Sequence, residues 1–562
     1  MKKKWEIISN SAEIIEELAE KNSISTLLAN ILINRGITKK KDIEHFINPT
    51  RKDFYDPFLM PDMDKAVDRI LKAINNKEKV IIYGDYDVDG ITATSVFTKF
   101  LKDCNFEVDN YIPNRLSEGY GLNEQAIKKI AENKYSLIIT VDCGITGCYE
   151  VELANSLGVD VVITDHHEPG EELPNAIAVV DCKRKDNQYP CNCLAGVGVA
   201  FKICQALCSK LKMDENIILK YLDIVAIGTI SDIVPLIDEN RIIAKLGLKL
   251  IEQTRNIGLK SLINSIGFKK IDSTSVSFGI APRINACGRM GFEDEALELF
   301  LTDNINQARS LTSNLNKHNA KRQEIEKSIF EQAISKIEAN HLYDDNIIVV
   351  GNEGWHNGVI GIVSSKITDL YSKPSILIDY QGDIGKGSGR SIPGFDLHEA
   401  LMQSSEYLDK FGGHSMAVGL TIEVDKIDEF RKHINQIADK LDISEIPSSL
   451  LIDQEITSKD LNYDVINDLK KLEPYGEANN VPVFIYRNLR VDSIRTLSEG
   501  KHLKISFKDN GVAIDGIGFN LGNYATDYVI GDKVDVACHL EENIFNGISR
   551  IQLNIKDIRK AY

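Results

Sequence analysis

The 562-residue sequence lacks any apolar run long enough to cross a bilayer. Its longest apolar segments, 159–164 and 221–230, are short or carry polar residues, whereas a membrane helix needs ~20 apolar residues. No apolar stretch follows the basic start MKKKW, so we expect no secretory signal and no membrane partner. Cysteine is sparse too: ten in a chain of this length cannot form a disulfide scaffold, which predicts reduced thiols in a cytoplasmic protein.

Five of these cysteines lie close together and raise the question of a zinc site: Cys182, Cys191, Cys193, Cys204 and Cys208. Their spacings are C-x-C and C-x3-C, not the paired C-x2-C knuckles of zinc sites. The last two fall in an apolar helical run over 194–211, where buried free cysteine behaves as a small hydrophobe. We therefore interpret this group as core packing rather than as zinc ligands.

Positive charge is in deficit, with 66 basic against 83 acidic residues and a net charge of −17. A protein that coats nucleic acid without specificity is usually basic, so the balance argues against that role. It leaves open a nucleic-acid enzyme with a local basic groove, because steering depends on the local potential.

The pattern of apolar runs predicts an α/β multidomain protein. From residue 78, strand-like runs at 80–83, 137–141, 160–164 and 177–180 alternate with helix-like segments, which indicates a parallel sheet covered by helices. A long polar segment without Gly or Pro predicts a connecting helix. A glycine-rich segment over 382–389 predicts a turn. Five short strand-like runs after Pro447, at 481–484, 489–494, 503–507, 514–518 and 532–540, suggest a small β-barrel. The expected divisions are an N-terminal helical segment (1–77), the parallel-sheet domain (78–303), the connecting helix (304–340), a smaller α/β domain (341–445) and the barrel (446–562).

The first predicted strand ends in YGDYDVDG, which places Asp85, Asp87 and Asp89 at alternate positions. The spacing is similar to a calcium loop of the EF-hand type, but such a loop follows a helix and ends in Glu, and here a strand precedes and Val96 holds the twelfth position. Three crowded carboxylates repel one another unless a cation neutralises them. We therefore expect a cation at this strand end.

Other acidic and imidazole groups follow the next strands. Asp142 ends the run TVDCG, His166 and His167 end TDHH, and Asp232 follows a helical stretch. Ligands of parallel sheets bind outside the carboxyl ends of the strands. A carboxylate-rich set with one or two imidazoles favours Mn²⁺ or Mg²⁺ and suffices for two ions that share one bridging Asp.

No Walker A motif is present, because neither Gly385-Lys386 nor Gly500-Lys501 is followed by Ser or Thr. Hydrolysis of a phosphoester therefore fits the sequence better than motion driven by ATP.

The ordered motifs GDYDVDG, VDCG, TDHH and SDIVPL resemble the DHH phosphoesterase superfamily. Four further motifs, APRINACGRM, GWHNGVIGIVSSK, SGRSIPG and FGGHSMAVG, resemble its RecJ family of single-strand-specific 5′→3′ DNA exonucleases. The resemblance covers about residues 50–562. It implies a DHH domain, a DHHA1 domain over 341–445 and a C-terminal OB-fold.

The resemblance also implies roles for the metal-site residues. Asp87 and Asp89 would each serve a different ion, Asp85 would support the first, and Asp142 would bridge the two. His166 and Asp232 would complete the shell of the second ion. His167 would face the scissile phosphate, with a second metal ligand as the alternative. Related DHH pyrophosphatases have a His where this chain has Tyr83, and Asp85 would compensate for it.

Substrate binding is implied for three arginines and two glycine-rich motifs. Arg115, Arg283 and Arg289 would contact the DNA backbone. Ser388 and Arg390, together with Gly412, Gly413 and His414, would capture phosphate, since glycine exposes backbone N–H groups and Arg binds phosphate in a bidentate manner. In the barrel, Lys501, His502 and Lys504 suit a single strand, whereas we assign Phe507 and Phe519 to the core.

The sequence thus favours a single-strand DNA exonuclease that acts in repair and recombination and, by family resemblance, works with a helicase and a single-strand-binding protein. Two alternatives are an enzyme for very short RNA or cyclic dinucleotides, whose common forms lack an OB-fold, and a non-catalytic replication scaffold. Intact Asp and His at every expected ligand position argue against the scaffold.

Overall fold

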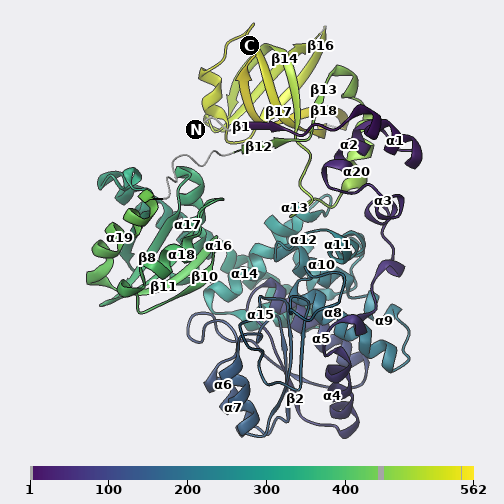
Figure 1. Ribbon diagram of the computed structural model, residues 1–562, viewed down its shortest axis with the longest axis vertical. Coiled ribbons are helices and arrows are strands. Elements are labelled where there is room, and N and C mark those ends of the chain that lie inside the picture. Colours follow the sequence, from purple (N-terminus) through teal and green to yellow (C-terminus); the bar gives the residue numbers. More distant parts are fainter. Residues whose placement is uncertain (1–3, 441–448, 510, 546, 562) are drawn as a thin grey trace. The chain divides into compact units, whose positions relative to one another are not determined.

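The computed structural model describes residues 4–440, 449–509, 511–545 and 547–561. The chain divides into two compact units, which are coloured along the sequence in Figure 1. The two-sheet unit comprises residues 55–234 and 247–446, and the barrel unit comprises residues 1–54, 235–246 and 447–562. The first 54 residues therefore group with the C-terminal barrel rather than with the segment that follows them.

The first sheet of the two-sheet unit is entirely parallel, in the order β3-β2-β4-β5-β6. Its strands are β2 (Val80–Tyr83), β3 (Asp109–Tyr111), β4 (Leu137–Val141), β5 (Asp160–Asp165) and β6 (Ala178–Asp181). β2 and β4 have the predicted bounds. Every residue of β2, β4 and β6 is buried, as expected for strands covered on both faces. The predicted fold class is confirmed for this domain.

Helices cover both faces of this sheet (Figure 1). On one face, α6 (Glu124–Glu132) and α7 (Cys148–Ser156) bury Ile127, Ile130 and Val151 against Ile138 and Ile163. On the other face lie α4 (Met63–Asn76), α5 (Val88–Asp103) and α8 (Gly196–Lys210). Each parallel strand is thereby held between two helical layers, and all strands end at one common edge.

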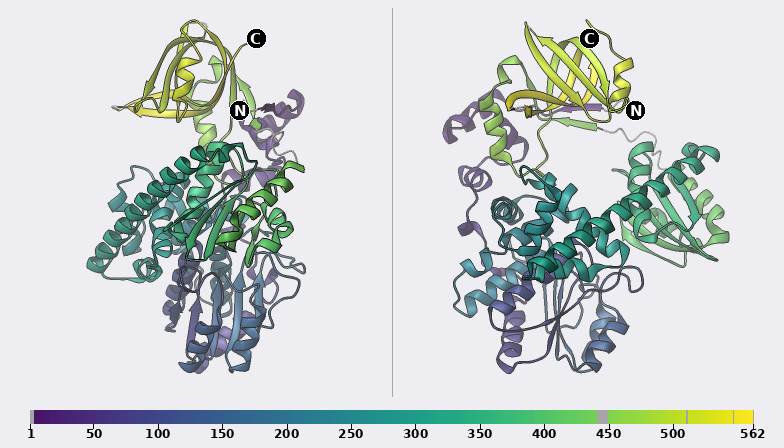
Figure 2. Two further views of the ribbon diagram at one scale, coloured as in Figure 1. Left: turned by 90° about the vertical axis from the view of Figure 1, so that its left-hand side faces the viewer. Right: turned by 180° about the vertical axis from the view of Figure 1, so that it is seen from behind.

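A helical region follows the sheet, and its last member is the long connecting helix predicted from the sequence. Its helices are α9 (Asn216–Leu219), α10 (Leu222–Ser231), α11 (Asp238–Ile251), α12 (Ile257–Ile266), α13 (Ser273–Ser275), a π-helical turn (Val276–Ile280), α14 (Ala281–Met290), α15 (Glu293–Leu301) and α16 (Ile305–Ala339). Figure 2 shows α16 extending from α14 and α15 to the second sheet. Buried residues at helical spacing, among them Leu311, Leu315, Ile329 and Ile337, anchor α16 along its length.

The second sheet has the order β10-β11-β9-β8-β7, with only β7 and β8 parallel. The strands are β7 (Ile348–Glu353), β8 (Ser375–Gln381), β9 (Ile384–Arg390), β10 (Lys410–His414) and β11 (Ala417–Glu423). Its helices are α17 (Asn357–Tyr371), α18 (Leu397–Gln403) and α19 (Ile427–Lys440).

The glycine-rich segment 382–389 was expected to be a turn, and that expectation is wrong for most of its length. The turn is confined to its start, and Gly385, Gly387 and Gly389 point into the core from β9. A Cβ at Gly387 would lie 2.8 Å from Leu420, and one at Gly389 would lie 2.8 Å from Val418. Glycine is used here to let strands and core side chains approach closely, not to reverse the chain.

The barrel unit closes β14 (Phe484–Leu497), β15 (His502–Asp509), β16 (Val512–Gly518), β18 (Ile548–Lys560) and β17 (Lys533–Phe545) into a barrel, because β14 pairs with β17. The predicted barrel is confirmed. The predicted run 489–494 lies within β14, the run 481–484 overlaps β14 only at Phe484, and β18 was not predicted. The unit also contains β1 (Lys4–Ile7), α1 (Ala12–Asn22), α2 (Thr26–Asn34), α3 (Lys40–Ile47), β12 (Ser449–Ile452), β13 (Gln454–Ile456) and α20 (Tyr463–Leu472).

A fully buried arginine joins the segments of the barrel unit. Arg241 of α11 donates hydrogen bonds to the carbonyls of Phe46, Lys471, Glu473 and Pro474, and its guanidinium lies 3.6 Å from the ring centroid of Phe46. These acceptors belong to α3 and to the end of α20. One side chain thus ties together three pieces of chain that are far apart in the sequence.

Among the described residues, no helix combines the length and the apolar character needed to span a membrane.

Candidate metal centre

The predicted acidic and imidazole residues come together at the carboxyl edge of the parallel sheet. Asp85 and Asp87 follow β2, and Asp89 lies in the first turn of α5. Asp142 follows β4, His166 and His167 follow β5, and Asp232 ends α10. This is the edge at which parallel sheets bind their ligands.

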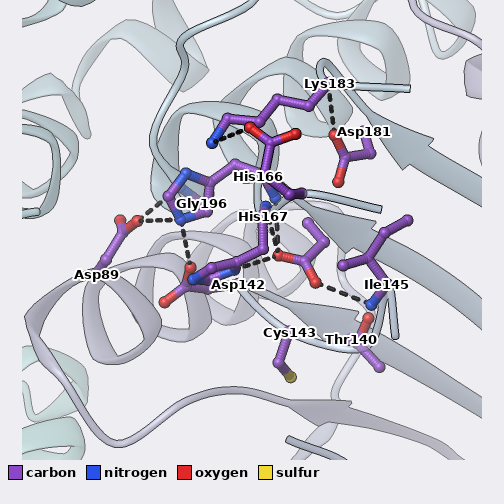
Figure 3. Close-up of polar contacts among 12 residues, drawn as sticks. Asp89, Thr140, Asp142, Cys143, Ile145, His166, His167, Asp181, Lys183 and Gly196 are labelled. Carbon is purple, nitrogen blue, oxygen red and sulfur yellow. Dashed lines mark hydrogen bonds and ion pairs between the residues drawn. The ribbon is translucent and has the colours of Figure 1, made fainter. Parts of the chain in front are cut away.

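His166 lies among the carboxylates. Its Nε2 is 3.1 Å from Asp142 Oδ1, 3.6 Å from Asp232 Oδ2 and 3.8 Å from Asp89 Oδ2. Figure 3 shows the imidazole between Asp89 and Asp142. Among the described residues, three groups bring potential ligand atoms within 4.8 Å of one another: Asp85 with Asp87 and Asp142, Asp89 with His166 and Asp232, and Asp142 with His166 and His167. Asp142 belongs to two of these groups, so it lies between the places that two ions would take.

Local backbone features hold these side chains in position. The Asp87 carboxylate accepts a hydrogen bond from Gly90 N (3.1 Å) and caps α5. Asp89 accepts hydrogen bonds from Gly196 N (2.6 Å) and Val197 N (2.9 Å) at the start of α8. A Cβ at Gly196 would lie 2.4 Å from Asp142 Oδ1, so only glycine allows α8 to approach this carboxylate so closely.

The chain's own groups leave this site electrostatically uncompensated. Burial, and then the neighbouring Asp87, raise the pKa of Asp85 and bring that of Asp89 to about 7. Burial and Asp89 likewise raise the pKa of Asp142, and they bring that of Asp232 to about 9. Burial, aided by His167, lowers the pKa of His166 to about 3. The protein disfavours the charged form of each group unless a positive charge is added.

Unpartnered buried atoms support the same conclusion. Within the described part of the chain, Asp85 Oδ1, Asp142 Oδ1 and both ring nitrogens of His166 form no hydrogen bond, although Asp142 Oδ1 and His166 Nε2 face each other at 3.1 Å. Buried polar atoms without a partner cost free energy, and native proteins contain few of them. A neutral imidazole and carboxylate oxygens are the donors that Mn²⁺ and Mg²⁺ accept. The residues therefore fit a pair of divalent cations.

His167 is held in a different manner. Its Nδ1 lies 2.8 Å from Asp165 Oδ1 and 3.1 Å from the Tyr120 hydroxyl. Burial lowers the pKa of His167, but the hydrogen bond and the charge of Asp165 outweigh it and raise this pKa to about 9. With Nδ1 engaged by Asp165, Nε2 is the ring nitrogen left for a ligand.

Two residues of the site, Asp165 and Tyr120, were not predicted from the sequence. The Asp165 carboxylate is fully buried and accepts hydrogen bonds from Ile145 N (2.9 Å) and His166 N (2.7 Å). The Tyr120 hydroxyl donates to Asp142 O at 3.2 Å. Asp165 precedes the two histidines directly, so its position in the motif was an available signal. Tyr120 lies in a loop, and the residues around it in the sequence form no pattern that points to the site.

Three of the predicted arginines gather beside the acidic cluster. Arg289 of α14 donates to Gly358 O at 2.9 Å, and burial together with Arg115 and the neighbouring Arg322 and Arg390 lowers its pKa to about 9. The guanidinium of Arg115 lies 4.9 Å from the ring centroid of Tyr86. Tyr86 is the residue between Asp85 and Asp87 in the sequence. Like charges brought this close require an anion near them.

Arg283 does not join this group. It donates from Nε to Asn316 Oδ1 (2.7 Å) and from Nη1 to Gly279 O (2.7 Å). Its contacts point to α16 rather than to the acidic cluster.

The two glycine-rich motifs lie on strands and share one face of the second sheet. Ser388 is in register with Gly419 and Gly412, and Arg390 is in register with Ala417 and His414. Gly412 has no atom within 4 Å of the position its Cβ would take. This face therefore offers an open surface with exposed backbone, but Gly412, Gly413 and His414 lie on the edge strand, two strands away from Arg390.

The cysteines form no metal site within the described residues. All ten are free thiols, and none belongs to a group that could hold a metal.

Three protein-family models match the chain. The DHH family N-terminal domain matches residues 79–229, the DHHA1 domain matches 344–440, and the RecJ OB domain matches 452–557. A parallel sheet with this acidic edge, followed by these two domains, defines a phosphoesterase of the DHH superfamily.

Full-length relatives narrow this class. The single-stranded-DNA-specific exonuclease RecJ of Bacillus subtilis is 40% identical over 99% of this chain and 71% of its own length. The protein of the same name from Escherichia coli is 32% identical over 95% of each chain. The crystal structure of RecJ from Thermus thermophilus in complex with Mn²⁺ matches with a TM-score of 0.86 and 29% identity, over 100% of this chain and 80% of that chain. A complex of the same protein with Mg²⁺ matches with a TM-score of 0.80. The chain belongs to the RecJ family.

Proposed function

We propose that this chain hydrolyses single-stranded DNA from its 5′ end to mononucleotides, with two divalent cations, Mn²⁺ or Mg²⁺, in the acidic site. The observation that carries the proposal is the group of buried carboxylates and the unpartnered His166 at the sheet edge, with three arginines beside it. The RecJ relatives are named for this activity. We assign the protein to DNA repair and recombination in the cytoplasm.

We assign Asp85 and Asp87 to one cation and Asp89, His166 and Asp232 to the other, with Asp142 shared between them. Support comes from the two groups of potential ligand atoms and from the contact of Asp142 with His166. When bound, two such cations activate a water molecule and stabilise the attacking and leaving oxygens of a displacement at phosphorus.

The remaining site residues orient the substrate. Asp165 holds the Nδ1 side of His167, so Nε2 can donate a hydrogen bond to an oxygen of the scissile phosphate. Tyr120 contacts both His167 and the backbone of Asp142, which fixes the imidazole relative to the metal-binding edge. His167 is thus assigned to the phosphate, and its neighbour His166 to a metal.

Arg115, Arg289 and Arg390 bind the phosphate at the 5′ end. Arg390 donates a hydrogen bond from Nη1 to Gly389 O at 2.7 Å. This contact fixes the orientation of its guanidinium on β9 before substrate binds. A terminal phosphate carries more charge than an internal phosphodiester, and a group of guanidinium ions distinguishes the two. Ser388, Gly412 and His414 extend this surface along the sheet face toward its edge, and Gly413 lies between the last two on the edge strand.

The barrel extends contact with the strand beyond the site. Phe507 is fully buried, as expected, but Phe519 is 52% exposed, so the prediction that it belongs to the core is wrong. It follows Gly518 at the end of β16 and packs its ring edge-on against His502, with 5.5 Å between ring centroids. An exposed aromatic pair beside Lys501 and Lys504 suits stacking on bases.

As partners, we propose a helicase, which would supply the single strand, and a single-strand-binding protein, which would present it. This rests on the family resemblance, and co-purification with the purified candidates would test it.

The function is tested with manganese and end-labelled single-stranded DNA, duplex DNA, a dinucleotide and a cyclic dinucleotide. We expect rapid release of mononucleotides from the 5′ end of the single strand alone. Equal or faster hydrolysis of the cyclic dinucleotide would instead assign the chain to signalling-nucleotide turnover. No hydrolysis of any substrate by the metal-loaded protein would contradict the proposal.

A further inference from the structure

A basic groove lies between α12 and α16, and no role assigned so far uses it. The groove has a volume of about 950 Å³, and its ionisable lining residues are Lys260, Arg309 and Lys317. No carboxylate lines it, although the chain as a whole carries a net charge of −17. Such a local excess of positive charge in an acidic protein marks a site for an anion.

The three cations have no competing partner within the described part of the chain. Lys260, Arg309 and Lys317 are exposed and form no ion pair or hydrogen bond there, whereas Arg322 and Lys366 both pair with Glu326. A cation without a partner gives up little when it binds an anion. These side chains are therefore free to receive a ligand's negative charge.

Polar side chains on the floor of the groove are held in place by hydrogen bonds between the two helices. Thr312 donates a hydrogen bond to Ser261 (2.9 Å), and Asn316 donates one to Ser265 (3.1 Å). The donors and the acceptors are each four residues apart in the same order, so α12 and α16 run in the same direction. The hydroxyl and amide groups of this floor can donate to phosphate oxygens. Ile257, Ile305 and Ala320 also line the groove, so apolar surface flanks these polar groups.

Helix α14 links one side of the groove to the metal centre. Asn316 lines the groove and accepts the hydrogen bond from Arg283, which lies near the start of α14. At the other end of this helix, Gly288 packs against the backbone of Tyr86, where a Cβ would lie 2.5 Å from Tyr86 O. Arg283 and Arg289 are separated by ~9 Å along the helix axis. One helix thus connects the groove to the loop of Asp85 and Asp87.

The larger cavity of the same unit serves as a contrast. It has a volume of about 1120 Å³ and lies around the start of β2 and the end of α5, but five cations and five carboxylates line it. Lys220, for example, is paired with Asp103 at 2.7 Å. Its charges are balanced by the chain itself, so it shows no preference for an anion.

We infer that the groove between α12 and α16 binds the phosphate backbone of the strand whose 5′ end lies in the metal centre, several nucleotides downstream of the cut. The inference rests on the proposed function, because that function supplies the strand. It explains why Arg283 faces α16: its hydrogen bond to Asn316 places a cation between the groove and the 5′-end arginines.

The test uses a triple variant, Lys260→Ala with Arg309→Ala and Lys317→Ala, in the full-length protein. A matched control removes three exposed lysines from α4, α6 and α11, namely Lys72→Ala with Lys129→Ala and Lys249→Ala, and so changes the net charge equally. Binding of labelled oligothymidine is measured by anisotropy in EDTA, which prevents cleavage. The strands are about 5 and about 20 nucleotides long, so the longer one exceeds the ~4–16 nucleotides that a single OB fold covers.

We expect the groove variant to bind the long strand at least tenfold more weakly at low salt and the short strand as wild type does. The slope of log K against log salt should flatten by about 2, since each lost phosphate contact contributes about 0.7 on a single strand. The control variant should match wild type. Long-strand binding equal to wild type, or equal weakening on both strands, would overturn the inference.

Two further measurements separate the possible failures. The first is binding of an oligoglutamate peptide. If the groove variant no longer binds this peptide but binds the long strand as wild type does, the groove is a protein-docking surface and the inference is overturned. Cleavage of short strands with manganese reports on the proposed function itself. If wild type cleaves them and groove binding fails, only the inference falls, whereas no cleavage by wild type refutes the proposed function.

Discussion

Two buried charged groups in this molecule differ in how the chain treats them. Arg241 in the barrel unit is 1% exposed, yet four backbone carbonyls and the ring of Phe46 surround its guanidinium. Asp142 in the two-sheet unit is 2% exposed, and its Oδ1 has no hydrogen-bond partner among the described residues. Both are costly to bury, but only the arginine is compensated by the chain.

The difference separates structural from functional burial. A buried charge with a full set of partners stabilises the arrangement that supplies them. A buried charge that the chain leaves unsatisfied requires a ligand to compensate it. Substitution should therefore affect unfolding at Arg241 and ligand binding at Asp142.

Asp142→Ala should reduce turnover of single-stranded DNA by roughly 10³-fold or more, equivalent to about 4 kcal/mol of transition-state stabilisation. The shared carboxylate is lost, and with it the spacing of both cations. Steady-state rates on an end-labelled strand measure the effect. Wild-type turnover in the purified variant would show that the site is wrongly assigned.

Arg241→Met should destabilise the barrel unit by about 3 kcal/mol, because four carbonyls lose their donor inside the protein. The two tryptophans allow each unit to be followed separately: Trp5 lies in the barrel unit and Trp355 in the two-sheet unit. Unfolding by denaturant is followed by tryptophan fluorescence. In a Trp355→Phe background the signal comes from Trp5 and reports on the barrel unit, and in a Trp5→Phe background it comes from Trp355 and reports on the two-sheet unit.

Lys245→Met is the matched control for Arg241→Met. Its Nζ donates to the carbonyls of Ile47 and Lys471, but the residue is only partly buried, so the loss should be below about 1 kcal/mol. If both substitutions lowered the free energy of unfolding by the same amount, burial of Arg241 would not account for its effect on stability.

Arg390→Ala should slow cleavage of 5′-phosphorylated ends by roughly tenfold, in line with the ~1.5–3 kcal/mol of a hydrogen bond to a charged group, and 5′-hydroxyl ends by less. Arg390→Lys should restore only part of the difference, since lysine keeps the charge but not the bidentate geometry. Arg431→Ala, which removes an arginine paired with Asp345 in the same domain, is the control. Equal slowing of both ends, with a lower melting temperature, would reduce Arg390 to a structural role.

The stability of the barrel unit should fall as the pH decreases from about 6.5 to about 4, by roughly 1–2 kcal/mol. Burial lowers the pKa of His539 to about 4, so over this range the unfolded chain binds a proton that the folded chain does not. His539 Nδ1 lies 2.8 Å from Pro482 O, and His539→Asn keeps an N–H donor without the titration. Unfolding followed at Trp5 across this range should lose part of its pH dependence in the variant.

Strand bounds could be predicted where the sequence carries its own signal. β2 and β4 are continuous runs of buried apolar residues, and their bounds match the prediction. β3 has only the residues Asp109–Tyr111 and no apolar run, and it was missed. β18 was missed because charged and polar residues, such as Arg550, Lys556 and Arg559, interrupt its apolar ones, and its pairing with β17 decides its structure. Pairing between strands that are distant in the sequence cannot be predicted from a local pattern of residues.

The site divides in the same way. Carboxylates and histidines at strand ends were predictable because the ends of parallel strands meet at one edge. Tyr120 could not be found, since its contacts with His167 and Asp142 depend on how a loop folds over the sheet. The distance of His414 from Arg390 depends on the strand order β9-β11-β10, and Arg283 separates from the other arginines because α14 directs it to Asn316. These positions follow from tertiary structure.

The most direct test of the central claim compares thermal unfolding of wild type and Asp142→Asn, followed at Trp355, in chelator and with Mn²⁺. If the chain leaves the buried carboxylates for cations to compensate, Asp142→Asn is no less stable than wild type in chelator. Saturating Mn²⁺ then stabilises wild type by about 2.7 kcal/mol at a concentration of 100 Kd and stabilises the variant far less. A variant that is less stable in chelator, or that gains as much from Mn²⁺ as wild type, would contradict the account.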